Sequence, residues 1–194
     1  MSKQSEEYQG RVYEMQPAAG ENHPSIDFEQ HGYWDEWAEL ERPFPPGVDT
    51  QHSVSLAFSV DHPEATAWDW YYGANDGLFS SRACDALWPW LRACSNRFAV
   101  ALNGETYYII NDNGKTVDCL DVDASKFVMF KSGPPTIKEA ECLRFIRSKL
   151  QDPMIFRLPQ YGAILATEAV RQRVADANLR GFEFIDCEAL RGYL

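Results

Sequence analysis

The stretch FAVALNGETYYII, residues 98–110, carries the strongest fold signal in this sequence. Two apolar runs flank Asn103-Gly104, and an Asn-Gly pair between such runs is typical of a β-hairpin with a tight turn. The next stretch, NDNGKTVDCLDV at residues 111–122, contains a second Asn-Gly pair and indicates a third strand. We therefore expect three sequential antiparallel strands, a meander, over residues 98–122.

Strands and a helix are also expected upstream of this hairpin. Residues 52–60 alternate apolar and small side chains, as a strand with one buried face does. The tryptophans and tyrosine of residues 68–72 alternate in the same way. Residues 81–94 read as a helix capped by Ser80 or Ser81, and Pro89 is expected to kink it or split it in two. Shorter elements are expected at the N-terminal side, a strand at 10–15 and a helix at 33–41.

Downstream, the pattern predicts two more helices and two more strands. Thr136 and Glu139 have the spacing of a capping box, so residues 136–150 are expected to form a helix. A second helix is expected to begin after Thr167, with Val170 and Val174 facing inward, and to stop at Gly181 in the left-handed conformation. The strands are expected at residues 152–159 and 182–187.

The resulting element order is roughly β-β-α-βββ-α-β-α-β. It predicts an α+β fold, a mainly antiparallel sheet with packed helices. Residues 1–50 are rich in acids and punctuated by Pro and Gly, so we expect them to form a segment packed on the core, with the α+β domain at residues 51–194.

The charge is strongly negative and uneven. The chain has a formal net charge of −11. Residues 1–80 contain fifteen Asp and Glu against three Lys and Arg, whereas residues 81–194 contain fourteen against fifteen. Nucleic acid and anionic membranes are bound through clustered Lys and Arg, so this balance argues against both as partners. It favours a basic partner or simply solubility.

The cysteines and the first residues indicate a reducing compartment. The five cysteines include no C-x-x-C pair, and the four histidines lie at the other end of the sequence, so no metal or cofactor is expected. The start, MSKQSEEYQG, has no apolar signal-peptide core, and no run of eighteen apolar residues follows. We expect a cytoplasmic protein with free thiols.

The usual catalytic motifs are missing from the sequence, including phosphate loops, zinc-protease motifs and nucleophile elbows. The best acidic cluster is Asp118, Asp121 and Asp123, which could suit a divalent cation but more simply reads as strand-end acids beside a turn. A Cys–His hydrolase using His52 or His62 stays open as an alternative, as does a ligand-binding module.

The acidic aromatic stretch near the N-terminus is the candidate partner-binding site. Tryptophan is favoured at binding hot spots, and neighbouring carboxylates can steer a basic partner. The alternative is a segment that covers the edge of the core. The candidate residues are Trp34, Asp35, Glu36, Trp37, Glu39 and Glu41.

The C-terminal third resembles the closing part of immunity protein family eleven of the bacterial polymorphic-toxin systems. The resemblance lies in IFRL at 155–158, in AILATEAVRQRV at 163–174 and in LRGFEF at 179–184. Upstream, LFSSRACDALWPWL at 78–91 and the strand carrying Asp118, Leu120, Asp121 and Ser125 also fit, so it spans roughly residues 68–187. It implies a protein that binds a cognate toxin domain and blocks it by occlusion, without catalytic residues of its own.

Overall fold

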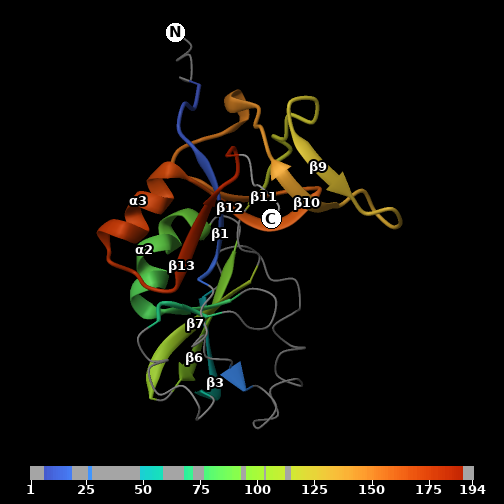
Figure 1. The fold of residues 1–194 in the computed structure, drawn as a ribbon. Coiled ribbons are helices and arrows are strands. Elements are labelled where there is room, and N and C mark those ends of the chain that lie inside the picture. Colours follow the sequence, from blue (N-terminus) through green and yellow to red (C-terminus); the bar gives the residue numbers. More distant parts are fainter. Residues whose placement is uncertain are drawn as a thin grey trace. The chain divides into compact units, whose positions relative to one another are not determined.

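The computed structural model describes most of the C-terminal half and parts of the N-terminal half. The described residues are 7–18, 26–27, 49–58, 68–71, 77–92, 95–102, 104–111 and 115–189. The chain divides into two compact units, each built from separate stretches. Figure 1 labels the helices and strands. Unit 1 comprises Met1–Gln16, Gly114–Arg173 and Phe184–Leu194, and unit 2 comprises Pro17–Asn113 and Val174–Glu183. The described part is mixed α and β with mostly antiparallel pairing, which confirms the predicted fold class.

Unit 2 contains a six-stranded sheet in the order β2-β3-β6-β7-β5-β4. The predicted hairpin is confirmed, because β6 and β7 pair antiparallel with Phe98 opposite Ile109, and Gly104 in the turn has a φ of 83°. The strand expected at 52–60 is also present, and it pairs parallel with β6. The strand bounds are β2 Ile26–Asp27, β3 Asp49–Phe58, β4 Trp70–Tyr71, β5 Leu78–Ser80, β6 Asn96–Leu102 and β7 Glu105–Asn111.

The helix of unit 2 is α2, Ser81–Leu91. Ser80 is its N-cap, as predicted, since the Ser80 hydroxyl accepts a hydrogen bond from the Ala83 N–H at 3.2 Å. Pro89 lies in the last turn of one uninterrupted helix, so of the two expected outcomes, a kink or a split, the split does not occur. Proline lacks the N–H that would bond to the carbonyl four residues earlier, and the helix ends two residues after Pro89. The buried face consists of Ala83, Cys84, Ala86, Leu87 and Leu91.

A five-stranded sheet in the order β13-β1-β12-β11-β8 lies mainly in unit 1. Its bounds are β1 Val12–Pro17, β8 Lys115–Thr116, β11 Ile155–Leu158, β12 Tyr161–Thr167 and β13 Phe182–Asp186. The strands predicted at 10–15, 152–159 and 182–187 are therefore confirmed, with shifted ends. Pairing is antiparallel between β1 and β12 and between β11 and β12.

The prediction that a third strand continues the β6–β7 hairpin as a meander is wrong. Residues 115–116 form β8, which pairs parallel with β11 in the five-stranded sheet and not with β7. The Val117 N–H continues this contact by donating to the Arg157 carbonyl at 2.8 Å. Cys119 and Leu120 are buried in the core cluster of unit 1, so burial of these side chains overrides the local hairpin signal.

The prediction of a helix at residues 136–150 is also wrong. Residues Ile137–Cys142 form β10, which pairs antiparallel with β9, Lys126–Met129, and only Arg147–Lys149 turns as a 3₁₀ helix. The Thr136 hydroxyl donates to the Pro134 carbonyl at 3.2 Å in place of the capping box. The buried positions Ile137, Ala140 and Cys142 suit an irregular strand on the core, and tertiary packing decides against the local helix signal.

The second predicted helix is confirmed as α3, Glu168–Asp176, with Val170 and Val174 buried. Its first two backbone N–H groups donate hydrogen bonds to side chains that are far away in the sequence. The Glu168 N–H donates to the Tyr8 hydroxyl at 3.0 Å, and the Ala169 N–H donates to the Asp152 carboxylate at 3.2 Å. Thr167 lies directly before the helix, but its hydroxyl accepts a hydrogen bond from the Met154 N–H at 2.9 Å.

The helix α3 ends at Asp176, several residues before the predicted stop at Gly181. Asn178 has a φ of 49° and its N–H donates to the Ala175 carbonyl at 2.9 Å, so Asn178 takes the left-handed position after the helix. Gly181 does have a positive φ of 85°, but it lies directly before β13. Asparagine tolerates this conformation better than most residues, which explains why the helix stops before the glycine.

Candidate functional site

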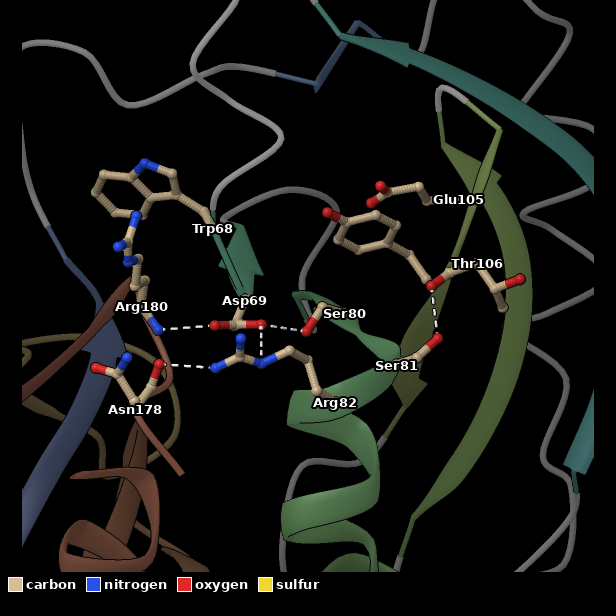
Figure 2. A pocket seen from close by; sticks show the side chains of 10 residues that line it. Trp68, Asp69, Ser80, Ser81, Arg82, Glu105, Thr106, Asn178 and Arg180 are labelled. Atoms are coloured by element: carbon tan, nitrogen blue, oxygen red, sulfur yellow. Dashed lines mark hydrogen bonds and ion pairs between the residues drawn. The ribbon is translucent and has the colours of Figure 1, made fainter. Parts of the chain in front are cut away.

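A pocket of about 470 Å³ opens in unit 2. Four stretches that are far apart in the sequence supply its walls (Figure 2). They are the residues before β4, the start of α2, the first residues of β7 and the turn after α3. The lining residues are Trp68, Asp69, Ser80, Ser81, Arg82, Glu105, Thr106, Tyr107, Asn178 and Arg180.

Asp69 is the buried charge of this pocket, with 5% of its surface exposed. One carboxylate oxygen accepts from the Ser80 hydroxyl at 2.5 Å, and the other accepts from the Arg180 N–H at 2.8 Å. The Asp69 N–H donates to the Arg180 carbonyl at 2.9 Å, and the Asp69 carbonyl accepts from the Ser80 N–H at 3.0 Å. Asp69 therefore joins the turn after α3 to the end of β5 (Figure 2).

Arg82 reinforces the same junction. Its Nε lies 3.4 Å from an Asp69 carboxylate oxygen, and its Nη2 donates to the carbonyls of Ala177 and Asn178 at 3.0 and 2.7 Å. Cations favour the carbonyls that a helix leaves unpaired at its C-terminus. The Arg82 side chain is 59% exposed, so its ion pair with Asp69 contributes at most about 1 kcal/mol.

The opposite wall comes from α2 and β7. The Ser81 hydroxyl donates to the Thr106 carbonyl at 2.8 Å, and Glu105 and Thr106 are exposed. The Tyr107 ring is buried and meets the Tyr71 ring edge to face, with centroids 5.9 Å apart. Burial raises the pKa of Tyr107 above its usual 10.0, so the phenol is protonated at neutral pH. The contacts of Asp69, Arg82 and Ser81 all join chain segments, as in a structural junction with a polar hollow at its centre.

The thiols of the described residues are buried. Cys84, Cys119, Cys142 and Cys187 are free cysteines, and Cys94 lies outside the described residues. Burial raises the pKa of Cys119 to about 12, which suppresses the thiolate that a nucleophile needs. This removes Cys119 as a nucleophile for the Cys–His alternative. The side chains of all four histidines also lie outside the described residues, so the rest of that alternative stays a prediction.

The acidic cluster at residues 118–123 borders a turn. The Asp121 carboxylate accepts from the Ala124 N–H at 3.1 Å, and the Ser125 hydroxyl donates to the Asp121 carbonyl at 2.6 Å. Asp118 and Asp123 are exposed. Across the part of the chain that the structure describes, no group of three or more His, Cys, Asp or Glu side chains is placed to hold a metal ion.

The predicted partner-binding residues, Trp34, Asp35, Glu36, Trp37, Glu39 and Glu41, lie outside the described residues. The sequence did not suggest the Asp69 junction. Its one visible signal was Ser80, which was expected as a helix cap. Nothing in the sequence pattern links Asp69 to Arg180, because they are 111 residues apart.

A model of the immunity protein family Imm11 matches residues 92–189, just over half of the chain. The chain belongs to the Imm11 family. The predicted resemblance to immunity protein family eleven is thereby confirmed. No curated protein matches the Imm11 chain. Within the described residues, neither helix is long and apolar enough to cross a membrane.

The match divides the pocket residues of this Imm11 chain. It includes those of β7 and of the turn after α3, whereas Asp69, Ser80 and Arg82 precede residue 92. It also includes every described element of unit 1 except β1 and the residues before it.

Proposed function

We propose that this Imm11 chain binds a cognate bacterial toxin domain and neutralises it by occluding the toxin's active site. Membership of an immunity protein family is the observation that carries the proposal. A protein that acts by occlusion needs no catalytic residues, so we assign no enzymatic activity to the chain. The toxin, a protein of the same cell, would be met in the cytoplasm.

The charge of the chain supports a basic partner. The net charge is −11, and the excess acids lie within the first eighty residues. Opposite charges on two proteins raise the rate at which they meet, by long-range steering. We assign this role to the acidic aromatic residues, namely Trp34, Asp35, Glu36, Trp37, Glu39 and Glu41. Nucleic acid and membranes are not proposed as partners.

The function is tested by rescue of growth. The probe is the toxin domain encoded next to the gene for this chain, expressed in cells that lack other protection. Co-expression of the chain is expected to restore growth, and the two purified proteins are expected to form a complex. Cells that die equally with and without the chain would refute the proposal.

The acidic aromatic site has its own test. The triple change of Asp35, Glu36 and Glu39 to Lys is expected to slow association about tenfold at low salt and to change dissociation little. The control is the same charge change at three other acids, Glu7, Asp118 and Asp176, which are exposed in the structure. Equal association rates for the two triple variants would show that the position of these charges is unimportant.

A small-molecule site is the second candidate function. The pocket around Asp69 has a volume of about 470 Å³, within the range of roughly 300–1,000 Å³ that is common for ligand pockets. Mass spectrometry of the purified chain under native conditions would detect a bound molecule. A ligand lost from Glu105→Ala and Arg180→Ala variants would favour this candidate.

A further inference from the structure

The pocket of unit 2 has a wall whose charges are already balanced within the chain. The Asp69 carboxylate accepts hydrogen bonds from the Ser80 hydroxyl and from the Arg180 N–H. The Arg82 Nε lies 3.4 Å from the same carboxylate. Asp69 and Arg82 therefore build the wall together, and neither needs a charge from a ligand.

Two other charged side chains line the pocket, Arg180 and Glu105, and both are exposed. Arg180 contacts Asp69 only through its backbone N–H and carbonyl, so its guanidinium takes no part in the junction. Among the described residues, no side chain forms an ion pair or a hydrogen bond with the Arg180 guanidinium or the Glu105 carboxylate. The pocket thus presents one positive and one negative charge that the described part of the chain does not neutralise.

These two charges lie on different sides of the pocket. Figure 2 shows Arg180 in the turn after α3 and Glu105 at the start of β7, with Asp69 and Ser80 between them in this view. The pocket has a volume of about 470 Å³, far more than the roughly 10–15 Å³ that a single water needs. An organic molecule that reaches both charges can therefore fit.

Trp68 supplies an apolar wall on the side of Arg180. A Cβ added to Gly181 would lie 2.6 Å from the Trp68 Cε3 atom, so the indole packs against the turn that carries Arg180. Ligand pockets commonly combine an aromatic wall with a few polar groups that fix the orientation of the ligand. The apolar part of a ligand would lie on this indole.

The pair of opposite charges distinguishes between classes of ligand. An anion such as phosphate would pair with Arg180 but would be repelled by Glu105, and a cation would meet the reverse. A neutral molecule would pair with neither. A molecule that carries both a carboxylate and an ammonium group forms a charge-assisted hydrogen bond with each.

We propose that the pocket between Arg180 and Glu105 binds a small zwitterion, either a free amino acid or a short peptide. Its carboxylate pairs with the Arg180 guanidinium, its ammonium group pairs with the Glu105 carboxylate, and an apolar side chain lies on Trp68. The inference rests on the small-molecule site that is the second candidate function, and it is independent of toxin neutralisation.

The experiment first measures the unfolding midpoint of the full chain with each standard L-amino acid and with each dipeptide Gly-Xaa. A ligand that binds the folded chain raises this midpoint by mass action. Calorimetry then gives Kd for the best probe, for its N-acetyl derivative, which lacks the ammonium group, and for its C-terminal amide, which lacks the carboxylate. Each derivative should bind about tenfold more weakly, because it loses one charge-assisted hydrogen bond. Inorganic phosphate should give no saturable binding.

Two variants assign the charges to their residues. Arg180→Gln should raise the Kd of the zwitterion about tenfold without raising that of the amide, which has no carboxylate to lose. Glu105→Gln should raise the Kd of the zwitterion about tenfold without raising that of the N-acetyl derivative. Both variants should unfold at the parent midpoint without ligand, because both side chains are exposed. Arg92→Gln, an exposed arginine of unit 2 outside the pocket, is the matched control and should bind like the parent.

Binding of free amino acids without dipeptides, or the reverse, identifies which of the two sources supplies the ligand. If no amino acid and no dipeptide shifts the midpoint, the proposal is overturned. Equal Kd values for a zwitterion and its two derivatives would also overturn it, since binding would not depend on the two charges, as would saturable binding of phosphate alone. Rescue of growth is the separate readout for neutralisation. A chain that rescues but binds no zwitterion loses only this inference, and a chain that binds a zwitterion but does not rescue loses only the neutralisation.

Discussion

Replacing Asp69 by alanine tests whether the pocket of unit 2 is a structural junction. Asp69 is 5% exposed and its carboxylate receives hydrogen bonds from the Ser80 hydroxyl and the Arg180 N–H. Alanine removes both acceptors at once. We therefore expect Asp69→Ala to lower the free energy of unfolding. If the carboxylate only contacted solvent, its removal would leave that free energy unchanged.

The magnitude follows from the groups left without a partner. A buried donor that loses its acceptor costs about 1–3 kcal/mol, which applies to the Ser80 hydroxyl. Arg180 is exposed, so water can replace the acceptor of its N–H, and losing this bond costs about 1 kcal/mol. The ion pair with Arg82 adds at most about 1 kcal/mol, because the Arg82 side chain is 59% exposed. We expect a loss of about 3 kcal/mol for Asp69→Ala. Asp69→Asn keeps one acceptor oxygen, so its loss should be smaller, about 1–2 kcal/mol.

Urea unfolding followed by tryptophan fluorescence gives the measurement. All six tryptophans lie between Trp34 and Trp90, within the chain range of unit 2, so the signal reports that unit. With a slope of about 1–3 kcal/mol per molar urea, a loss of 3 kcal/mol lowers the midpoint by roughly 1–3 M. Glu105→Ala is the matched control, because this carboxylate lines the same pocket but is exposed.

Equal midpoints for Asp69→Ala and Glu105→Ala would refute the reasoning. A higher midpoint for Asp69→Ala would point to a different role, since residues retained for activity commonly reduce stability. In that case Asp69 itself would be reconsidered as a ligand-binding or catalytic residue.

Gly181→Ala should destabilise unit 2 by at least about 2 kcal/mol, because φ is 85° and the new Cβ would lie 2.7 Å from the Trp70 carbonyl oxygen. The control is Gly104→Ala, where φ is 83° and no atom lies within 4 Å of the new Cβ. This control should lower the free energy of unfolding by only about 1 kcal/mol in the same urea assay. Phe156→Ala should destabilise unit 1 by about 3–5 kcal/mol, measured by circular dichroism, since this side chain is fully buried. Cys119 should react with a thiol reagent at pH 8 about a thousandfold more slowly than an ordinary thiol, because burial raises its pKa from 9.0 to about 12. The same shift makes stability fall as the pH rises from 9 to about 12, since the unfolded thiol ionises first. A Cys119→Ala variant should show a weaker dependence, because buried tyrosines with raised pKa, such as Tyr107, contribute the rest.

The local signals in this sequence succeeded where neighbouring residues alone determine the conformation. The Asn103-Gly104 hairpin and the Ser80 cap are of this kind, because each depends on a few adjacent residues. The signals failed where burial competes with local preference. Thr136 and Glu139 have the spacing of a capping box, yet Ile137 beside them is drawn into the core as part of a strand.

The candidate site was also missed because it depends on contacts between distant residues. The Asp69 junction depends on Arg180 and Arg82, and no periodicity in a sequence reveals a contact between residues this far apart. The hairpin of β9 and β10 was missed for another reason. Phe127 and Met129 alternate with Val128 and Phe130, as in a strand with one buried face. Residues 126–130 were assigned to no element in the sequence analysis, so this alternation was not used.

The residues that the family model matches leave out strands that both large sheets contain. In the five-stranded sheet, β1 lies between β13 and β12, and β1 precedes residue 92. In the six-stranded sheet, β6 and β7 are flanked by β3 and β5, which also precede it. A segment limited to 92–189 would leave the hydrogen-bonding edges of four strands without their neighbours, and such edges favour aggregation. The strands β1, β3 and β5 are therefore part of the fold of this Imm11 chain, although they precede the residues that the family model matches.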